Sequence, residues 1–340
     1  MVMLLLGYIF LDLDSSVLKF STAKIRIRTY NCHRFAIFTT MNTKQPQSLQ
    51  RGDLVAIVTT ARKIDREDIQ KAIELLESWG LNAVIGKTIG KSDHQFGGTD
   101  ADRITDFQEA MDNDAVKAIW CARGGYGTVR LLDSLDFTKF SINPKWVVGF
   151  SDVTALHSHI HNLGIQTIHG LMPITVESST PGALISLKKA LFGDVLRHEV
   201  PCESKNKYGE ATGEIVGGNL SMLYSLLGSN SAIKTSDKIL FIEDLDEYLY
   251  HVDRMMMNLK RNGYFGNLKG LVIGGMTKMN DNTIPFGKTA EEIILDNIKE
   301  FDFPVCFNFP AGHLKDNRAL IFGRCVEFNT QKEGTTLTFI

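Results

Sequence analysis

The sequence is poor in cysteine, and its few cysteines are not paired in any recognisable spacing. No C-x-x-C occurs among the five, which are Cys32, Cys121, Cys202, Cys306 and Cys325. An odd number of scattered cysteines argues against a disulfide framework, and the missing C-x-x-C pairs argue against a zinc ribbon. We therefore expect free thiols, the usual state in a reducing compartment.

An excess of charge of one sign is also absent. The chain has 37 Lys and Arg against 39 Asp and Glu, which gives a formal net charge of −2. A nucleic-acid-binding protein needs a basic surface, so no nucleic-acid partner is expected. Hydrophobic residues make up 44% of the 340 residues and charged residues 22%, a balance typical of a globular protein of roughly two domains.

No apolar run is long enough to cross a bilayer, which takes about 20 residues, so no membrane partner is expected. The N-terminal run M-V-M-L-L-L-G-Y-I-F is interrupted by Asp12 and Asp14 and has neither a basic region before it nor a small-residue cleavage site after it. It does not fit a signal peptide. We predict that residues 1–46 are a non-domain extension, that Met41 is the natural start and that the protein is cytoplasmic. A transit-like role for the basic, acid-free stretch Leu18 to Arg34 is the alternative.

Strands and helices alternate in the first half of the chain. The apolar runs L-V-A-I-V, V-K-A-I-W-C and W-V-V-G-F predict strands buried on both faces, with helical patterns between them. This alternation predicts an α/β fold, with a parallel-sheet (flavodoxin-like) domain over residues 47–175. Residues 176–208 are polar and rich in turn residues, so we place a linker there. Residues 209–340 predict a C-terminal mixed α/β domain, because strands such as K-I-L-F-I-E-D alternate with helices before a β-rich end.

Ser151 follows one of these strands directly, in W-V-V-G-F-S-D-V-T-A-L-H, and a helix is predicted immediately after it. A serine at such a nucleophile-elbow-like turn has its Oγ clear of the backbone, beside helix N–H groups that favour negative charge. That setting suits the nucleophile of an acyl transfer. However, Val153 stands where G-x-S-x-G has its second glycine, and serine is a common helix N-cap. This segment alone leaves both interpretations open.

A glycine cluster, R-G-G-Y-G, ends another predicted strand. Neither G-x-G-x-x-G nor a Walker lysine motif is present, so nucleotide binding has little support and no cofactor is expected. Consecutive glycines let the backbone approach a ligand with its N–H groups. Ligands of parallel sheets bind at the carboxyl ends of strands, so Gly124 and Gly125 should share an edge with Ser151. An anion nest, an oxyanion hole and a plain turn all remain open.

Two further residues occupy positions suited to acid–base chemistry. Glu243 follows the strand I-L-F-I directly, where a carboxylate can orient a histidine. His313 follows a Pro-Ala-Gly turn, a loop setting suited to a general base. Taken alone, a solvated acidic cluster and an incidental loop histidine are the simpler explanations of these residues.

A metal site is the alternative suggested by His157 and His161, which are four residues apart on one predicted helix face. H-E-x-x-H is absent and no third ligand is apparent, so we predict no metal and a solvated helix face.

Seven segments, in order along the chain, resemble the LD-carboxypeptidase (muramoyltetrapeptide carboxypeptidase) family. They are L-Q-R-G-D-L-V-A-I-V, C-A-R-G-G-Y-G, P-K-W-V-V-G-F-S-D-V-T-A-L, T-I-H-G-L-M-P, G-E-I-V-G-G-N-L, I-L-F-I-E-D and F-P-A-G-H. The resemblance extends from about Leu49 to the C-terminus and leaves out only the extension. Each segment is moderately specific, but seven in family order make chance similarity improbable.

The resemblance implies a serine peptidase whose catalytic triad is Ser151, Glu243 and His313. The serine would lie in the parallel-sheet domain, and Glu243 and His313 in the C-terminal domain. We therefore expect the active site at the domain interface, with a Ser151–His313 distance that depends on domain closure. Members of the family are typically homodimers and need no metal.

The resemblance also implies an oxyanion hole made by the backbone N–H groups of Gly125 and Asp152, beside Gly124. The implied substrate is a murein tetrapeptide, cut before its terminal D-alanine during cell-wall recycling. One alternative is a related immunity-type peptidase that cleaves a peptide–nucleotide antibiotic, which an aromatic stacking platform in the C-terminal half would favour. Another is a non-catalytic two-domain protein that binds anions through R-G-G-Y-G.

Overall fold

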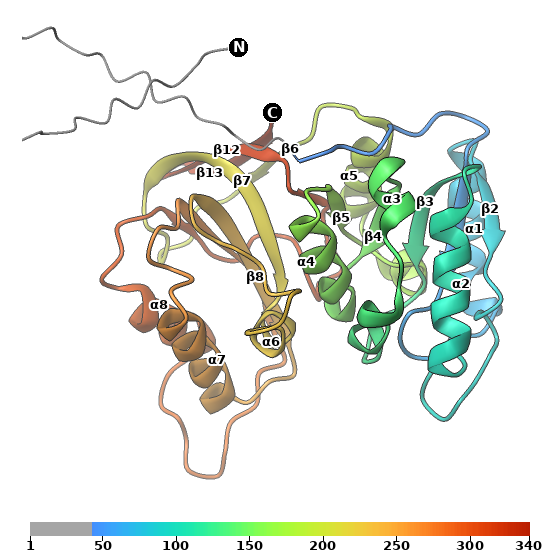
Figure 1. Cartoon of the computed structure of the whole chain (residues 1–340). Coiled ribbons are helices and arrows are strands. Elements are labelled where there is room, and N and C mark those ends of the chain that lie inside the picture. The colour runs from blue at the N-terminus through green and yellow to red at the C-terminus, as the bar shows by residue number, and fades with distance from the viewer. Residues whose placement is uncertain (1–42) are drawn as a thin grey trace, which may run out of the picture. The chain divides into compact units, whose positions relative to one another are not determined.

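Two β-sheets organise residues 43–340, the part of the chain that the computed structural model describes (Figure 1). The first sheet has six strands, and all neighbouring strands run parallel except β11 and β5, which are antiparallel. In sheet order the strands are β11 (Leu320–Phe322), β5 (Thr167–His169), β4 (Trp146–Gly149), β3 (Val116–Cys121), β1 (Leu54–Val58) and β2 (Asn82–Ile85). The predicted parallel sheet is confirmed.

Helices cover both faces of this sheet, which explains why its strands are continuous apolar runs. The helices are α1 (Gln70–Ser78), α2 (Asp100–Asp112), α3 (Thr138–Ile142), α4 (Thr154–Asn162) and α5 (Pro181–Phe192). The side chains of β1 alternate between the two faces. Val55 and Ile57 share a buried cluster with residues of α1 and α5, whereas Ala56 and Val58 share another with residues of α2 and α4.

The second sheet is mixed, as predicted. Its seven strands run parallel from β10 to β7 and antiparallel from β7 to β6. In sheet order they are β10 (Val305–Cys306), β9 (Gly270–Thr277), β8 (Lys238–Leu245), β7 (Gly209–Asn219), β12 (Cys325–Gln331), β13 (Gly334–Phe339) and β6 (Arg197–Val200). The helices of this half are α6 (Leu220–Ser225), α7 (Leu249–Arg261) and α8 (Ala290–Ile298).

One hydrophobic core runs through both sheets. It contains Ile168 of β5, Phe241 of β8 and Phe322 of β11, each of which is almost fully buried. Strand β11 comes from the C-terminal part of the chain but completes the N-terminal sheet. Side chains of the two halves are therefore fixed against each other, which matters for a site built from both.

The predicted boundary of the N-terminal extension at residue 46 is too late. Residues 1–42 lie outside the described residues, but Lys44 pairs in parallel with Ile165. Its N–H donates to the carbonyl of Gly164 at 2.6 Å, and Pro46 is buried. The folded part therefore begins no later than Thr43.

The segment 176–208, predicted as a linker, contains regular structure. Helix α5 packs against the first sheet through Ala183, Leu187 and Leu191, and β6 pairs with β13. The apolar residues of the helix recur four apart, a pattern that the polar, turn-rich sequence on either side of it obscured. Between β3 and β4, where a helical pattern was expected, residues 128–134 form two short 3₁₀ turns.

Within residues 43–340 the cysteines are free thiols, as the sequence led us to expect. Cys121 and Cys306 are buried, and Cys202 and Cys325 are partly buried.

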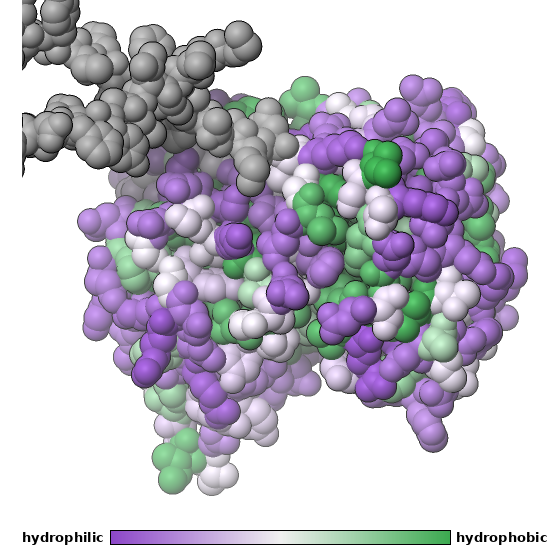
Figure 2. Space-filling view, viewed as in Figure 1, coloured by the Kyte–Doolittle hydropathy of each residue, from purple (hydrophilic) through white to green (hydrophobic). Residues whose placement is uncertain are grey.

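The same part of the chain contains no helix both long and apolar enough to span a bilayer. On the face shown in Figure 2 most residues are hydrophilic and the hydrophobic ones lie in scattered patches.

Candidate active site

Ser151 lies at a strained turn between β4 and α4. It is the first residue of a short 3₁₀ turn, Ser151–Val153, and its φ is +62°. Non-glycine residues rarely adopt this left-handed conformation, which costs about 1–3 kcal/mol and is found most often at functional sites. Phe150, not Ser151, occupies the N-cap position, and no side-chain cap hydrogen bond is present. The plain helix-cap interpretation of Ser151 therefore fails.

His313 lies directly against this serine. Its Nε2 is 3.1 Å from the Oγ of Ser151, within hydrogen-bond reach, although 162 residues separate the two along the chain. The imidazole also packs edge-on against the ring of Phe150, with 4.9 Å between ring centroids. The two halves are thus already close enough for contact, and the wider gap that an open domain arrangement would give is not seen.

Glu243 holds the other side of the same imidazole. It lies near the end of β8 and is fully buried, and its Oε2 is 2.6 Å from Nδ1 of His313. The same oxygen accepts a hydrogen bond from the backbone N–H of His313 at 3.1 Å. The carboxylate therefore fixes both the ring and the backbone of the histidine, and it favours a tautomer with the proton on Nδ1.

A glycine makes this approach possible. Gly312 has a φ of +98°, and a Cβ built on it would come within 2.6 Å of Oε2 of Glu243. Its N–H donates to the side-chain oxygen of Asn317 at 2.8 Å, which fixes the turn. Any larger residue at position 312 would push the loop that carries His313 away from the carboxylate of Glu243.

The electrostatics of the site favour a charged histidine. Burial lowers the pKa of His313, but the charge and hydrogen bond of Glu243, together with the charge of Asp244, outweigh it, so its pKa lies above the usual 6.5. Burial, with the neighbouring charge of Glu243, raises the pKa of Asp244 to about 7. An imidazolium that forms during a reaction would therefore be stabilised where it stands.

The glycine cluster lies beside the serine, as the sheet topology predicted. A Cβ built on Gly124 would be 3.2 Å from Cβ of Ser151 and 3.5 Å from the backbone N of Asp152. Gly125 follows with a φ of +114°. The buried carboxylate of Asp152 accepts a hydrogen bond from the N–H of Thr128 at 2.8 Å, and this ties the glycine cluster to the serine turn. The role of these N–H groups as an oxyanion hole stays a prediction.

The predicted solvated face of α4 is wrong, because His157 and His161 are both buried. His157 contacts Thr167 Oγ1 at 2.8 Å and the carbonyl of Gly149 at 2.9 Å. His161 pairs with the carboxylate of Glu214. Both histidines thus have structural partners, because α4 packs between the halves instead of facing solvent. Among residues 43–340, no group of three His, Cys, Asp or Glu side chains is placed to hold a metal ion.

Comparison with known families agrees with the geometry. Residues 55–170 match the LD-carboxypeptidase N-terminal domain, and residues 212–328 match the LD-carboxypeptidase C-terminal domain. The chain belongs to the LD-carboxypeptidase family. It is therefore a peptidase, and its two-domain α/β fold is that of the family.

Individual proteins similar to this LD-carboxypeptidase family member agree with this assignment. The probable murein peptide carboxypeptidase of Bacillus subtilis is 33% identical over 300 residues, covering 85% of this chain and 92% of its own. The crystal structure of muramoyltetrapeptide carboxypeptidase from Oxalobacter formigenes has a TM-score of 0.78 at 27% identity, covering 84% and 98% of the two chains. The microcin C7 self-immunity protein MccF of Escherichia coli is 29% identical but covers only 60% of this chain and 69% of its own.

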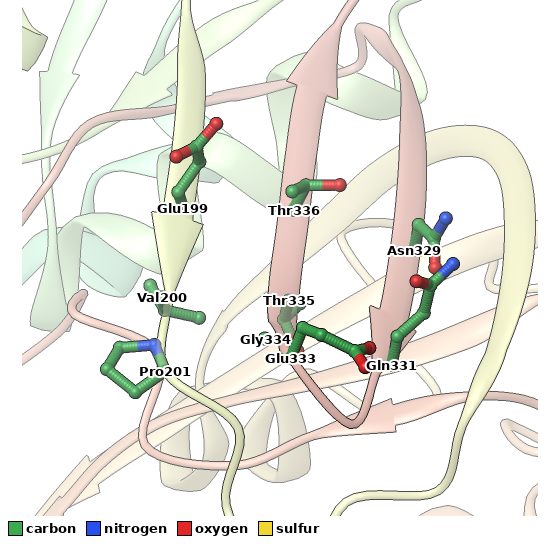
Figure 3. A pocket seen from close by; sticks show the side chains of 9 residues that line it. All are labelled: Glu199, Val200, Pro201, Asn329, Gln331, Glu333, Gly334, Thr335 and Thr336. Carbon is green, nitrogen blue, oxygen red and sulfur yellow. The ribbon is translucent and has the colours of Figure 1, made fainter.

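One pocket of this LD-carboxypeptidase family member lies away from the serine. It has a volume of about 560 Å³ and lies at the β6 edge of the second sheet, where residues of that strand and of the β12–β13 hairpin line it (Figure 3). Six of its nine lining residues have polar side chains, among them Glu199, Asn329 and Glu333. None of the predicted site residues lines it, so this pocket is not the candidate active site.

Some residues of this LD-carboxypeptidase site were not found from the sequence. Phe150 packs between the rings of His313 and His169. Asn317 lies in L-K-D-N-R-A-L, to which the sequence assigned no role, and its contact with Gly312 depends on the tertiary fold. Arg62, which lies against Gly125, could have been found from the sequence. It follows the first strand, and the carboxyl ends of parallel strands share the sheet edge where Ser151 lies.

Proposed function

We propose that this peptidase is a serine carboxypeptidase that cleaves the amide before the terminal D-alanine of murein tetrapeptides. The observation that carries the proposal is the hydrogen-bonded series Glu243–His313–Ser151 at a strand–turn–helix junction. The substrate class follows from the names of the Bacillus and Oxalobacter relatives. A role in cell-wall recycling, a cytoplasmic location and a homodimeric state are part of the same proposal.

In the proposed mechanism, Ser151 is the nucleophile and His313 is the general base. The Nε2 of His313 takes the proton of Ser151 Oγ as this oxygen forms a bond to the carbonyl carbon of the scissile amide. The tetrahedral intermediate then collapses, the C–N bond breaks, and His313 returns the proton to the departing amine of D-alanine. Water, activated by the same histidine, hydrolyses the acyl-enzyme and restores Ser151.

Glu243 and the glycine cluster support these steps. Glu243 keeps the histidine in the correct tautomer and stabilises the imidazolium. The backbone N–H groups of Gly125 and Asp152 are proposed to donate to the oxyanion, with Gly124 leaving room for the substrate carbonyl beside Ser151. Each such donor typically contributes a factor of about 10²–10³ in kcat.

The test is release of free D-alanine from a defined tetrapeptide by the purified protein. Ser151→Ala should reduce turnover by more than roughly a thousandfold, since loss of a triad nucleophile usually costs more than that, without changing the melting temperature greatly. The exposed Ser134, changed to alanine, is the matched control and should leave turnover unchanged. Retained turnover in the Ser151 variant would contradict the assignment of the nucleophile.

The same assay separates the proposed substrate from the rival classes. A tetrapeptide ending in L-alanine should be a poor substrate, because the scissile bond precedes a D-residue. A peptide–nucleotide conjugate tested in parallel should also react slowly. Preference for the conjugate would replace the murein substrate by the antibiotic-cleaving alternative, and no hydrolysis of any of these substrates would favour a binding protein.

A further inference from the structure

Three cationic residues gather where β1 and β3 end, next to the glycine cluster. Arg62 and Lys63 follow β1, and Arg123 follows β3. Nη1 of Arg123 donates to the carbonyl of Lys63 at 3.1 Å, which joins the two strand ends. The proposed mechanism assigns no role to any of the three.

The backbone that carries Arg62 is fixed. Its carbonyl accepts a hydrogen bond from Oγ1 of Thr59 at 2.8 Å, and the neighbouring N–H of Lys63 donates to the carbonyl of Gln95 at 2.9 Å. Thr59 itself is fully buried. The position from which the Arg62 side chain leaves the backbone is therefore well defined.

The Arg62 side chain is exposed, but its stem lies along the glycine cluster. A Cβ built on Gly125 would be 2.5 Å from its Cδ and 2.8 Å from its Nε. The preceding residue, Gly124, is the one that contacts Ser151. The guanidinium group thus lies one residue step beyond the glycine that faces the nucleophile.

The charge of Arg62 is uncompensated within residues 43–340, where its guanidinium group has neither an ion pair nor a hydrogen bond. Arg130, an arginine of similar setting at the end of a nearby 3₁₀ turn, instead pairs with Asp100 through Nη2 at 2.6 Å. An unpaired arginine beside an active site is free to bind an anion, and its planar group matches a carboxylate with two parallel hydrogen bonds.

The proposed reaction supplies such an anion. A peptidase that removes the last residue always has the terminal carboxylate of its substrate one residue beyond the scissile carbonyl, a step of about 3.5 Å. We propose that Arg62 binds the terminal carboxylate of the peptide substrate and so restricts cleavage to the last amide bond. This inference rests on the proposed function. Arg123 positions Arg62 by holding the two strand ends together.

The experiment compares one tetrapeptide with two C-terminal groups, a free carboxylate and a carboxamide. The wild-type protein should cleave the acid with the higher kcat/KM. Arg62→Gln should lower kcat/KM for the acid by about 10- to 100-fold, the usual value of a hydrogen bond to a charged group, and leave that for the amide unchanged. Arg62→Lys, which keeps the charge but not the bidentate geometry, should restore part of the loss. Arg66→Gln, an exposed arginine four positions along, is the matched control.

A binding measurement adds a second readout. In Ser151→Ala protein, calorimetry should show that Arg62→Gln weakens binding of the acid by the same factor and binding of the amide hardly at all. If wild type releases no D-alanine from the acid, the proposed function fails and this inference falls with it. If wild type is active and Arg62→Gln affects acid and amide equally, or neither, only the carboxylate-binding role is overturned.

Discussion

Nδ1 of His313 lies 2.6 Å from Oε2 of Glu243, although the two residues are 70 positions apart in the sequence. The carboxylate is fully buried, and burial makes a carboxylate costly unless hydrogen bonds or a positive charge compensate it. The N–H groups of the His313 ring and backbone supply that compensation. The pair therefore depends on both partners, and this has consequences for pH dependence.

Activity should fall on the acid side with a midpoint above pH 6.5. His313 must be neutral to accept a proton, and Glu243 and Asp244 raise its pKa above 6.5 in spite of burial. The histidine is therefore protonated, and inactive as a base, up to a higher pH than a free imidazole. The pH dependence of kcat/KM for D-alanine release checks this expectation, and an acid limb below pH 6.5 would contradict it.

Glu243→Gln should move the same titration in the opposite direction. Without the carboxylate charge, burial dominates and the pKa of His313 should drop below 6.5, while kcat falls by roughly 10⁴, as for the loss of a triad carboxylate elsewhere. Titration of the His313 ring by NMR measures the shift directly. Glu247→Gln, which removes the carboxylate paired with His251 at 2.7 Å, is the control and should leave the His313 titration nearly unchanged.

Removal of divalent metals should not affect turnover. Within the described part of the chain no group of three potential ligand side chains is placed to hold an ion, and the proposed proton transfers use protein groups alone. D-alanine release after dialysis against EDTA should equal that of untreated protein, with a zinc peptidase treated in parallel as a positive control. Loss of activity that zinc restores would sink the metal-free mechanism and return attention to His157 and His161.

Residues 1–40 should be dispensable for folding and turnover, whereas residues 41–46 should contribute to stability. The N–H of Lys44 donates to Gly164 and its carbonyl accepts from Gln166, at 2.6 and 3.0 Å. A chain that begins at Met41 should melt and turn over like the full-length protein. A chain that begins at Gln47 loses these two bonds, each contributing about 1 kcal/mol, and should melt about 4–8 °C lower. Equal melting temperatures of the two shortened chains would contradict the revised boundary.

The strands were the most predictable part of the fold. The strand Leu54–Val58 is a continuous apolar run because helices cover both of its faces, and burial of that kind leaves a signal in the local sequence. Strand β11 has no such signal in the local sequence, because it is only three residues long and pairs with β5 of the N-terminal half. Helix α4 was predicted correctly but its environment was not, since the partner of His161 is Glu214 of the other half.

The candidate site was predictable only through the order of its segments. A serine after a strand, a glutamate after a strand and a histidine after a turn each have an ordinary structural explanation, and no local pattern says that they meet. The resemblance to a family supplied that information for Ser151, Glu243 and His313. It did not extend to Asn317, whose contact with Gly312 is set by tertiary packing alone, or to Arg62, whose one local signal is its position after the first strand.

Gly312→Ala should separate the effect of the Glu243–His313 contact from that of backbone strain. Gly312 has a φ of +98°, and the new Cβ would lie 2.6 Å from both Cγ and Oε2 of Glu243. The fully buried carboxylate has no solvent-facing space into which to move, so the histidine loop must shift instead. A displacement of this size at a catalytic group costs about 10² in rate, and we expect at least that loss in kcat.

Gly287→Ala is the matched control for this substitution. Gly287 has a similar φ of +84°, but no atom lies within 4 Å of the Cβ that alanine would add. Both substitutions impose the same backbone penalty of about 1 kcal/mol, so both variants should lose a few degrees in melting temperature. Only Gly312→Ala also forces Glu243 and His313 apart, and only it should lose turnover. Equal kcat values for the two variants would mean that the carboxylate does not need to touch the imidazole, which the proposed mechanism does not allow.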